Sequence, residues 1–224
     1  MKRYELKFIS SIEHLESIKM LLESNSLCFK EHFENRQVNN MYFDDLNLKR
    51  YYDSEEGISI RSKLRLRWYE KIFPNSFQPK LEIKEKYGLL NSKKTFLLKK
   101  YNFNDFMQNP KNFVIQDAKN VENSAFFMEN LIDNIPTIMN SYQRYYYISK
   151  NNKIRATIDY DLKYLNVNKF SLYQNNFFND LIVLEIKFDE NDYNIANTFI
   201  TTLPLRIKKF SKYVVGVKTI NKFH

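Results

Sequence analysis

The 224-residue sequence contains one cysteine, three histidines and only three glycines. The single Cys28 excludes a disulfide within the chain. The histidines, at positions 14, 32 and 224, lack the spacing of a zinc site. Gly57, Gly88 and Gly216 lie too far apart to build a P-loop or a G-x-G-x-x-G turn. If the protein handles phosphates or nucleotides, we expect side chains to bind them rather than a glycine-rich loop.

The sequence also lacks long apolar runs. No run approaches the ~20 residues of a membrane span, and the N-terminus has no signal-peptide core. We therefore expect a cytoplasmic location. Hydrophobic residues make up 43% of the chain and aromatic residues 16%, which is enough for a packed core. The formal net charge of +9 favours an anionic partner. The usual aromatic-platform motifs of RNA binders are absent, so we do not expect nucleic acid.

The segment from Ile58 to Trp68 reads I-S-I-R-S-K-L-R-L-R-W. Side chains alternate between the two faces of a strand. One face therefore carries four cations, and the other is apolar. Same-face neighbours lie only about 6.6–6.8 Å apart, so the cations repel one another and call for an anionic partner. The cations are Arg61, Lys63, Arg65 and Arg67; the apolar residues, which we expect to be buried, are Ile58, Ile60, Leu64, Leu66 and Trp68.

Other segments have the same pattern and predict further strands. Lys80–Tyr87 places Lys80, Glu82, Lys84 and Lys86 opposite Leu81 and Ile83. The remaining predicted strands are Arg3–Phe8, Asn39–Phe43, Lys93–Leu98, Ser141–Ser149, Arg155–Asp161, Lys169–Tyr173 and Leu181–Phe188. Because no linker rich in Gly, Ser or Pro interrupts the chain, we expect one domain over residues 1–224.

Helical spacing appears between these strands. Ser10 and Glu13 predict a capping box before a helix that runs to about Leu27. A short helical or irregular segment is predicted at 46–52, helical and loop-like structure with a break at Pro110 at 104–134, and a helix at 190–203. Residues 211–219 close the chain. The fold class is therefore α+β.

The strands are charged on one face and apolar on the other. An ordinary sandwich, with its charged faces in water, is one interpretation. The other is a closed antiparallel eight-stranded β-barrel with helices packed on the outside and charged side chains lining a lumen. The charged faces contain few Ser or Thr, which favours the barrel. A lumen with many cations and a few carboxylates, such as Glu5, Glu82 and Glu185, suits a polyanion together with Mg²⁺ or Mn²⁺.

Several segments resemble the triphosphate tunnel metalloenzyme (CYTH-like) superfamily, and within it the VTC domain, the polyphosphate polymerase module of the vacuolar transporter chaperone. The resemblance covers nearly the whole chain. The similar segments are R-Y-E-L-K-F (3–8), M-Y-F-D (41–44), L-R-L-R-W-Y (64–69), L-E-I-K (81–84), Arg144, R-A-T-I-D (155–159), L-E-I-K (184–187) and K-F-S-K-Y (209–213).

The resemblance implies an eight-stranded tunnel that transfers the terminal phosphoryl group of ATP to a polyphosphate chain. Mn²⁺ or Mg²⁺ would be held by Glu185, and Glu5 is a second candidate. The implied catalytic residues are Arg65, Arg67, Lys84, Glu185 and Lys212. The implied phosphate-binding residues are Lys7, Lys63, Arg65, Arg67, Lys84, Lys86, Lys94, Arg144, Arg155 and Lys212. We expect a freestanding form without the SPX and membrane domains of eukaryotic members. Association with a membrane partner and the oligomeric state stay open.

Simpler interpretations stay open as well. Glu185 could pair with Lys187 alone, and Arg65 and Arg67 could be surface charges. Asp159 and Asp161 suit a metal or a strand end equally, and Lys212 could belong to a solvated helix end. For function, a tunnel triphosphatase and a non-catalytic polyanion-binding module are the alternatives to the polymerase.

Overall fold

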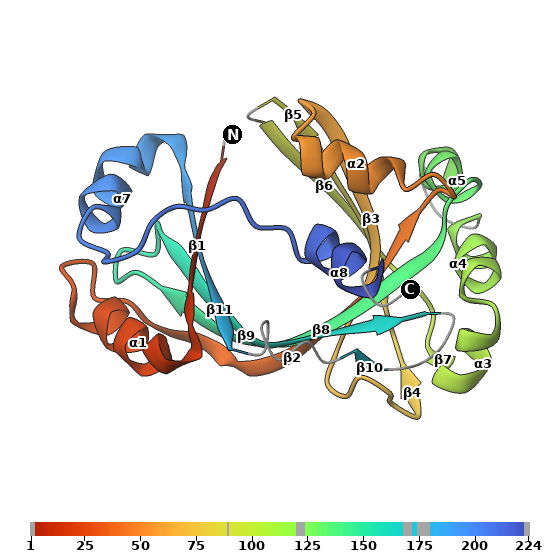
Figure 1. Ribbon diagram of the computed structural model, residues 1–224, viewed down its shortest axis with the longest axis horizontal. Helices are drawn as coiled ribbons and strands as arrows, with labels where there is room; N and C mark the ends of the chain where they lie inside the picture. Colours follow the sequence, from red (N-terminus) through yellow and green to blue (C-terminus); the bar gives the residue numbers. More distant parts are fainter. Residues whose placement is uncertain (1–2, 89, 120–123, 168–171, 174–179, 222–224) are drawn as a thin grey trace. The chain divides into compact units, whose positions relative to one another are not determined.

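The computed structural model describes residues 3–88, 90–119, 124–167, 172–173 and 180–221 (Figure 1). Within them, hydrogen bonds join eight strands into an antiparallel sheet in the order β1-β11-β9-β8-β2-β3-β5-β6, and β10 pairs with β9. Strands β4 and β7 form a separate pair. The strands are β1 (Arg3–Ser11), β2 (Lys30–Asp44), β3 (Ile60–Tyr69), β4 (Ser76–Phe77), β5 (Lys80–Tyr87), β6 (Leu90–Leu97), β7 (Tyr101–Asn102), β8 (Ile135–Ile148), β9 (Arg155–Asn166), β10 (Leu172–Tyr173) and β11 (Leu181–Asp189).

The helices lie between and after these strands. They are α1 (Leu15–Ser24), α2 (Lys49–Glu56), α3 (Phe103–Gln108), α4 (Pro110–Ala118), α5 (Ser124–Leu131), α7 (Tyr193–Ile200) and α8 (Lys212–Asn221), with short 3₁₀ turns at Ile12–His14 and Glu190–Asp192. No helix among the described residues has the length and hydropathy needed to cross a bilayer.

The chain divides into two compact units. Unit 1 comprises Met1–Gln37, Tyr142–Lys163 and Gln174–Phe210, and unit 2 comprises Val38–Ser141, Tyr164–Tyr173 and Ser211–His224. Strands β2, β8 and β9 contribute residues to both.

In unit 1, helices α1 and α7 cover the apolar face of β1, β9 and β11 (Figure 1). This face consists of alternate residues, such as Ile158 of β9 and Leu184 of β11, which are both buried. Leu22 of α1 and Phe199 of α7 pack against them. The alternation leaves the charged residues on the opposite face of the same strands.

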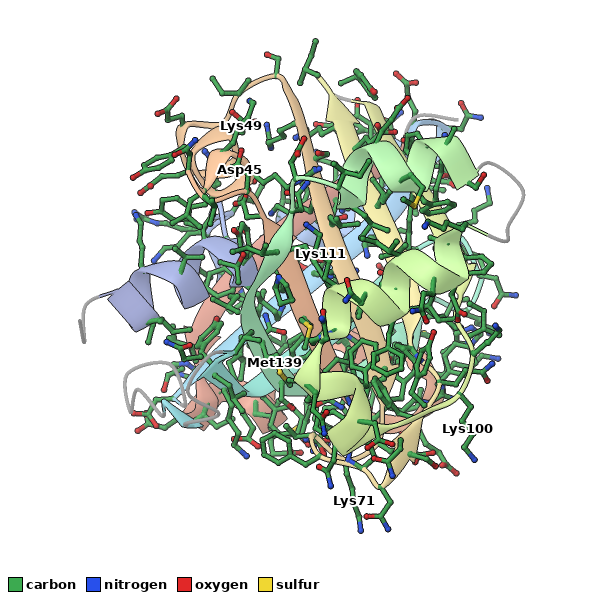
Figure 2. All side chains as sticks on the ribbon, turned by 90° about the vertical axis from the view of Figure 1, so that its right-hand side faces the viewer. Asp45, Lys49, Lys71, Lys100, Lys111 and Met139 are labelled. Carbon is green, nitrogen blue, oxygen red and sulfur yellow. The ribbon has the colours of Figure 1, made fainter. Side chains whose placement is uncertain are left out.

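In unit 2, helices α3, α4 and α5 cover the apolar face of β2, β3 and β5. Figure 2 looks onto these helices, with Lys111 of α4 labelled and the strands behind them. Leu64, Leu66 and Trp68 of β3 are buried in this core, as the alternation predicts. Ile58 and Ile60 are 44% and 67% exposed, so the prediction that they are buried is wrong. Ile60 is the first residue of β3 and Ile58 precedes the strand, and both lie outside this cluster of buried residues.

Helix α8 lies on the other side of β3 from α4 and α5 (Figure 1). Its Tyr213 ring stacks on Tyr42 of β2, with ring centroids 5.0 Å apart. A Cβ on Gly216 would lie 2.6 Å from Tyr164 Cδ1, so only glycine permits this close approach to the strands. Unit 2 thus has a helix on its polar face as well as on its apolar face.

Several local predictions need correction. The capping box does not form, because Ser10 belongs to β1 and its hydroxyl contacts His14 Nδ1 instead. Strand β2 begins at Lys30, nine residues before its predicted start. Of the strand predicted at 169–173, residues 169–171 lie outside the described residues, and Leu172–Tyr173 form β10.

Candidate functional site

The polar face of unit 1 carries two acids and two bases on adjacent strands, which we call the charged quartet: Glu5 and Lys7 of β1, and Glu185 and Lys187 of β11. Glu5 pairs in register with Lys187, and Lys7 with Glu185. Lys7 Nζ lies 3.3 Å from Glu5 Oε1 and 3.4 Å from Glu185 Oε2. Lys187 contacts the other oxygen of Glu185 and lies 3.9 Å from Glu5 Oε2. Both carboxylates therefore share both ammonium groups.

The charges of the quartet outweigh the effect of burial. Burial alone would raise the pKa of Glu185, but Lys7, Lys187 and Arg144 hold that pKa well below its usual range. Burial alone would lower the pKa of Lys7, but Glu185 and Glu5 raise it above its usual value. Lys7 and Glu185 are therefore both charged at neutral pH. Glu185 therefore does pair with Lys187, as one interpretation of the sequence suggested, but this ion pair is one part of a larger network.

Beside the quartet, Arg144 of β8 forms a two-pronged ion pair with the fully buried Asp159 of β9. Its Nε and one terminal nitrogen donate to the two carboxylate oxygens over 2.5 and 2.7 Å. Asp159 and Glu185 raise the pKa of Arg144 against the effect of its burial. Asp159 therefore fixes the orientation of an arginine, and Asp161 pairs with Lys163 instead. Arg155 is exposed and lies opposite Lys187.

The quartet fits a divalent cation that is bound together with a phosphate substrate. Mg²⁺ and Mn²⁺ use one or two carboxylates and take water and phosphate oxygens for their remaining positions. Glu5 and Glu185 supply two carboxylates, each of which also contacts the ammonium groups of Lys7 and Lys187. Thr157 lies opposite Glu185, and its buried hydroxyl has no hydrogen-bond partner within the described chain. Among the described residues, no group of three or more His, Cys, Asp or Glu side chains is placed so that it could hold a metal ion.

The polar face of unit 2 carries a row of three lysines, which we call the lysine row: Lys63 of β3, Lys84 of β5 and Lys93 of β6. Lys63 pairs in register with Lys84, and Lys84 with Lys93. Like charges directly opposite one another destabilise a sheet. This row therefore has the electrostatic character of a surface that binds an anion.

Next to the row, one buried carboxylate holds three cations. Arg65 donates to Glu82 Oε2 through two nitrogens at 2.9 and 2.7 Å, and Lys93 Nζ lies 2.5 Å from Glu82 Oε1. Arg67 lies 3.9 Å away. Burial alone would raise the pKa of Glu82, but these cations hold it well below its usual range. One carboxylate leaves two of the three positive charges uncompensated within this group.

Asparagines extend this site along the polar face. Arg67 Nε donates to Asn40 Oδ1 at 2.9 Å, and Asn40 Nδ2 donates to Asn140 Oδ1 at 2.8 Å. This series of hydrogen bonds runs from β3 to β2 and then to β8. Tyr42, the next polar-face residue of β2, accepts a hydrogen bond from Arg65. Polar groups on three strands thus converge beside the arginines.

The start of α8 lies at the same face. Lys63 Nζ donates to Ser211 Oγ at 2.7 Å, and Ser211 Oγ accepts from the backbone N–H of Val214. Lys212 is the first residue of α8. The structure therefore brings the predicted residues Lys63 and Lys212 to neighbouring positions.

The predicted site residues fall into two groups, one in each unit. Lys7, Glu5, Glu185, Arg144 and Arg155 share the polar face of unit 1, and Lys63, Arg65, Arg67, Lys84 and Lys86 share that of unit 2, with Lys212 at the start of α8. Lys94 does not join them. It pairs with Ile83, and its Nζ lies 3.4 Å from the Phe126 ring centroid of α5, on the apolar side. Lys93 takes the position on the polar face that the sequence analysis assigned to Lys94.

The sequence analysis missed Lys93, Asn40 and Asn140. Residues that pair directly across an antiparallel hairpin point to the same face. Lys84 and Lys93 are an odd number of residues apart and pair in this way, so the position of Lys93 follows once β5 is paired with β6. The role of the two asparagines could not be predicted, because the sequence does not indicate which partner the side-chain amide of a residue in a strand will bind.

Several solved structures share the fold of this chain. A plant protein from Hippeastrum, described as a putative adenylyl cyclase, HpAC1, with a dominant triphosphatase activity, is 13% identical, covers 97% of this chain and 96% of its own, and has a TM-score of 0.57. The PH1819 protein from Pyrococcus horikoshii is 10% identical and a putative adenylate cyclase from Vibrio parahaemolyticus 11%. Each covers 96% of this chain and 98% of its own, with a TM-score of 0.53. At these identities the likeness concerns the fold alone.

The VTC domain matches residues 2–221, nearly the whole sequence. The chain therefore belongs to the VTC domain family. Among curated proteins, no sequence matches it.

Proposed function

We propose that this protein is a metal-dependent polyphosphate polymerase. It transfers the terminal phosphoryl group of ATP to the end of a polyphosphate chain and releases ADP. The polar face of unit 2 carries this proposal, because the opposed lysines of the row and the neighbouring Arg65 and Arg67 outnumber the one carboxylate, Glu82, that contacts them, and this excess of positive charge favours a polyanion. Membership of the VTC domain family supports the choice of polyphosphate.

The fold that serves this reaction is a closed tunnel. We infer that the eight strands close into an antiparallel barrel whose charged faces line a lumen. The alternation supports this, since β1, β3 and β11 each set their charged residues on one face. The solved structures of the same fold include a protein with triphosphatase activity.

Within this proposal, unit 2 binds and orients the phosphates. Arg65 and Arg67 hold phosphate oxygens through their planar forks, and Lys63, Lys84, Lys86 and Lys212 act as point charges. Unit 1 adds Lys7, Arg144 and Arg155. These groups neutralise the charge that spreads over the transferred phosphoryl group, which is the main catalytic demand of such a transfer. Glu185 and Glu5 would hold Mn²⁺ or Mg²⁺, which supplies further neutralisation of the phosphate oxygens.

Polyphosphate synthesis tests the proposal directly. Purified protein is incubated with ATP and Mn²⁺, and the products are separated on a gel stained for polyphosphate. Long chains together with ADP are the expected result. Free phosphate without chains contradicts the polymerase and supports the triphosphatase, which the likeness to HpAC1 favours as the second candidate.

A matched pair of variants tests the role of the quartet. Glu185→Gln is expected to abolish turnover and to leave binding of triphosphate, measured by titration calorimetry, within a few-fold of wild type. Glu16→Gln removes an exposed carboxylate from α1 and serves as the control. Turnover by Glu185→Gln at the wild-type rate would contradict the proposed metal site. If the wild-type protein binds triphosphate but turns over no nucleoside triphosphate with any metal tested, the result supports a non-catalytic module instead.

A further inference from the structure

The hydrogen-bond chain from Arg67 to Asn140 has a fixed direction. A guanidinium has donors and no acceptor, so Arg67 Nε must meet the oxygen of Asn40 and not its nitrogen. Asn40 then has only its Nδ2 left for Asn140, and Asn140 must present its oxygen in turn. The positions of both amide groups follow from this chemistry. The far end of the chain is therefore a donor, Asn140 Nδ2.

This terminal donor has no partner among the described residues, although Asn140 is only 1% exposed. Buried amide groups are nearly always hydrogen-bonded, and a buried donor without an acceptor destabilises the protein. The missing partner must be an acceptor, since Nδ2 can only donate. The charges nearby indicate its sign. Arg65, Arg67 and Lys93 surround a single carboxylate, so the field on this face favours a negatively charged oxygen.

We propose that Asn140 binds an oxygen of the phosphate substrate through Nδ2, as a neutral donor beside the cations of unit 2. This inference rests on the proposed function and adds a specificity-determining residue to the phosphate site. The directed chain gives the amide a fixed orientation, because Arg67 holds Asn40 and Asn40 holds Asn140. A neutral donor strengthens binding without adding charge, so its contribution depends little on salt.

Asn39 offers a matched control. It is the neighbour of Asn40 in β2, is fully buried and has the same side chain. Its Nδ2 is occupied by the backbone carbonyls of Glu70 and Lys71, and it lies on the opposite face of β2. Truncation of Asn39 therefore removes a buried amide of similar exposure from a position that does not face the phosphate site.

Titration calorimetry with inorganic triphosphate compares wild type, Asn140→Ala and Asn39→Ala at two salt concentrations. We expect Asn140→Ala to raise the Kd about tenfold at both, the usual loss for one hydrogen bond to a charged group. Asn39→Ala should stay within twofold of wild type. Equal Kd values for Asn140→Ala and wild type, or equal losses in both variants, would overturn the inference.

A second measurement needs no altered binding site. The side-chain amide signal of Asn140 in ¹⁵N-asparagine-labelled wild type is assigned by its absence from Asn140→Asp. It should shift on addition of triphosphate, with the midpoint found by calorimetry, whereas that of the exposed Asn197 in α7 should not. An unmoved Asn140 signal at saturating triphosphate overturns the inference, even if polymerase activity is present. A shifted signal without polyphosphate synthesis supports it and contradicts the polymerase alone.

Discussion

Tyr213 donates a hydrogen bond from its phenolic hydroxyl to Oδ2 of Asp44, and Asp44 lies 169 positions earlier in the chain. The fully buried carboxylate of Asp44 also accepts the backbone N–H groups of Asp45, Arg50 and Tyr51. One carboxylate therefore ends β2, caps the first turn of α2 and holds α8. The placement of Lys212, which precedes Tyr213, depends on this contact.

Removal of the Tyr213 hydroxyl should loosen unit 2. Tyr213→Phe leaves Asp44 with one donor fewer at a buried position, so we expect a loss of about 1–3 kcal/mol in the free energy of unfolding. Urea denaturation followed by fluorescence measures it. Tyr52→Phe, which alters a ring that is 51% exposed on α2, is the control. Equal losses in the two variants would show that the Asp44 contact does not stabilise the fold.

Gly216 should not tolerate a methyl group. Alanine is the better helix former by about 1 kcal/mol, yet a Cβ at this position meets Tyr164 Cδ1 at 2.6 Å and also contacts Ile138 Cδ1. We expect Gly216→Ala to destabilise the protein by about 1–3 kcal/mol. Ile138→Val removes the contacting Cδ1 atom, so the double variant should recover part of the loss. A Gly216→Ala protein as stable as wild type would contradict the close packing of α8.

Strict alternation made much of the sheet predictable from the sequence. Strand β5 has the predicted bounds, and Leu64, Leu66 and Leu81 are buried, as the pattern indicates. Charged and apolar residues alternate from Lys80 to Lys84, so the buried face is specified over this part of the strand. Membership of the VTC domain family was predicted from the same strands, together with the K-F-S-K-Y segment, and is confirmed.

Features that depend on distant contacts were not predictable. The first half of β2 is exposed and polar on both faces, so it has no alternation to recognise. The assignment of Lys94 to the polar face failed because it depends on the register of β6, which the β5 pairing sets. Helix α8 covers a polar face, and the contact that holds it joins Asp44 and Tyr213 across most of the sequence. The orientation of Arg144 likewise depends on Asp159, a partner from another strand.

Glu82 should make stability depend on pH in the acid range. Its folded-state pKa lies below the ordinary value of 4.5, so its carboxylate stabilises the folded state above about pH 4.5. That contribution is lost as the pH falls from 4.5 through the folded pKa. Glu82→Gln leaves Arg65, Arg67 and Lys93 without a counter-charge, and we expect it to cost about 3 kcal/mol at pH 7.

The difference in unfolding free energy between wild type and Glu82→Gln should therefore shrink as the pH falls below 4.5. Urea denaturation between pH 3 and pH 7 measures it, with Glu16→Gln as a control for an exposed carboxylate. A difference that stays constant over this range would contradict the assignment of Glu82 as the counter-charge of these cations.

The pair of Arg144 and Asp159 should behave as one unit in a double-mutant cycle. Asp159→Asn replaces one acceptor with an amide that points at the guanidinium, so a buried charge loses its partner. We expect a loss of about 3–5 kcal/mol in unfolding free energy for Asp159→Asn and a similar loss for Arg144→Gln. The double variant should lose less than the sum of both, because the second change removes the group that the first left unpaired. Losses that simply add would show that the two side chains stabilise unit 1 independently, and Asp159 would then have no role in orienting Arg144.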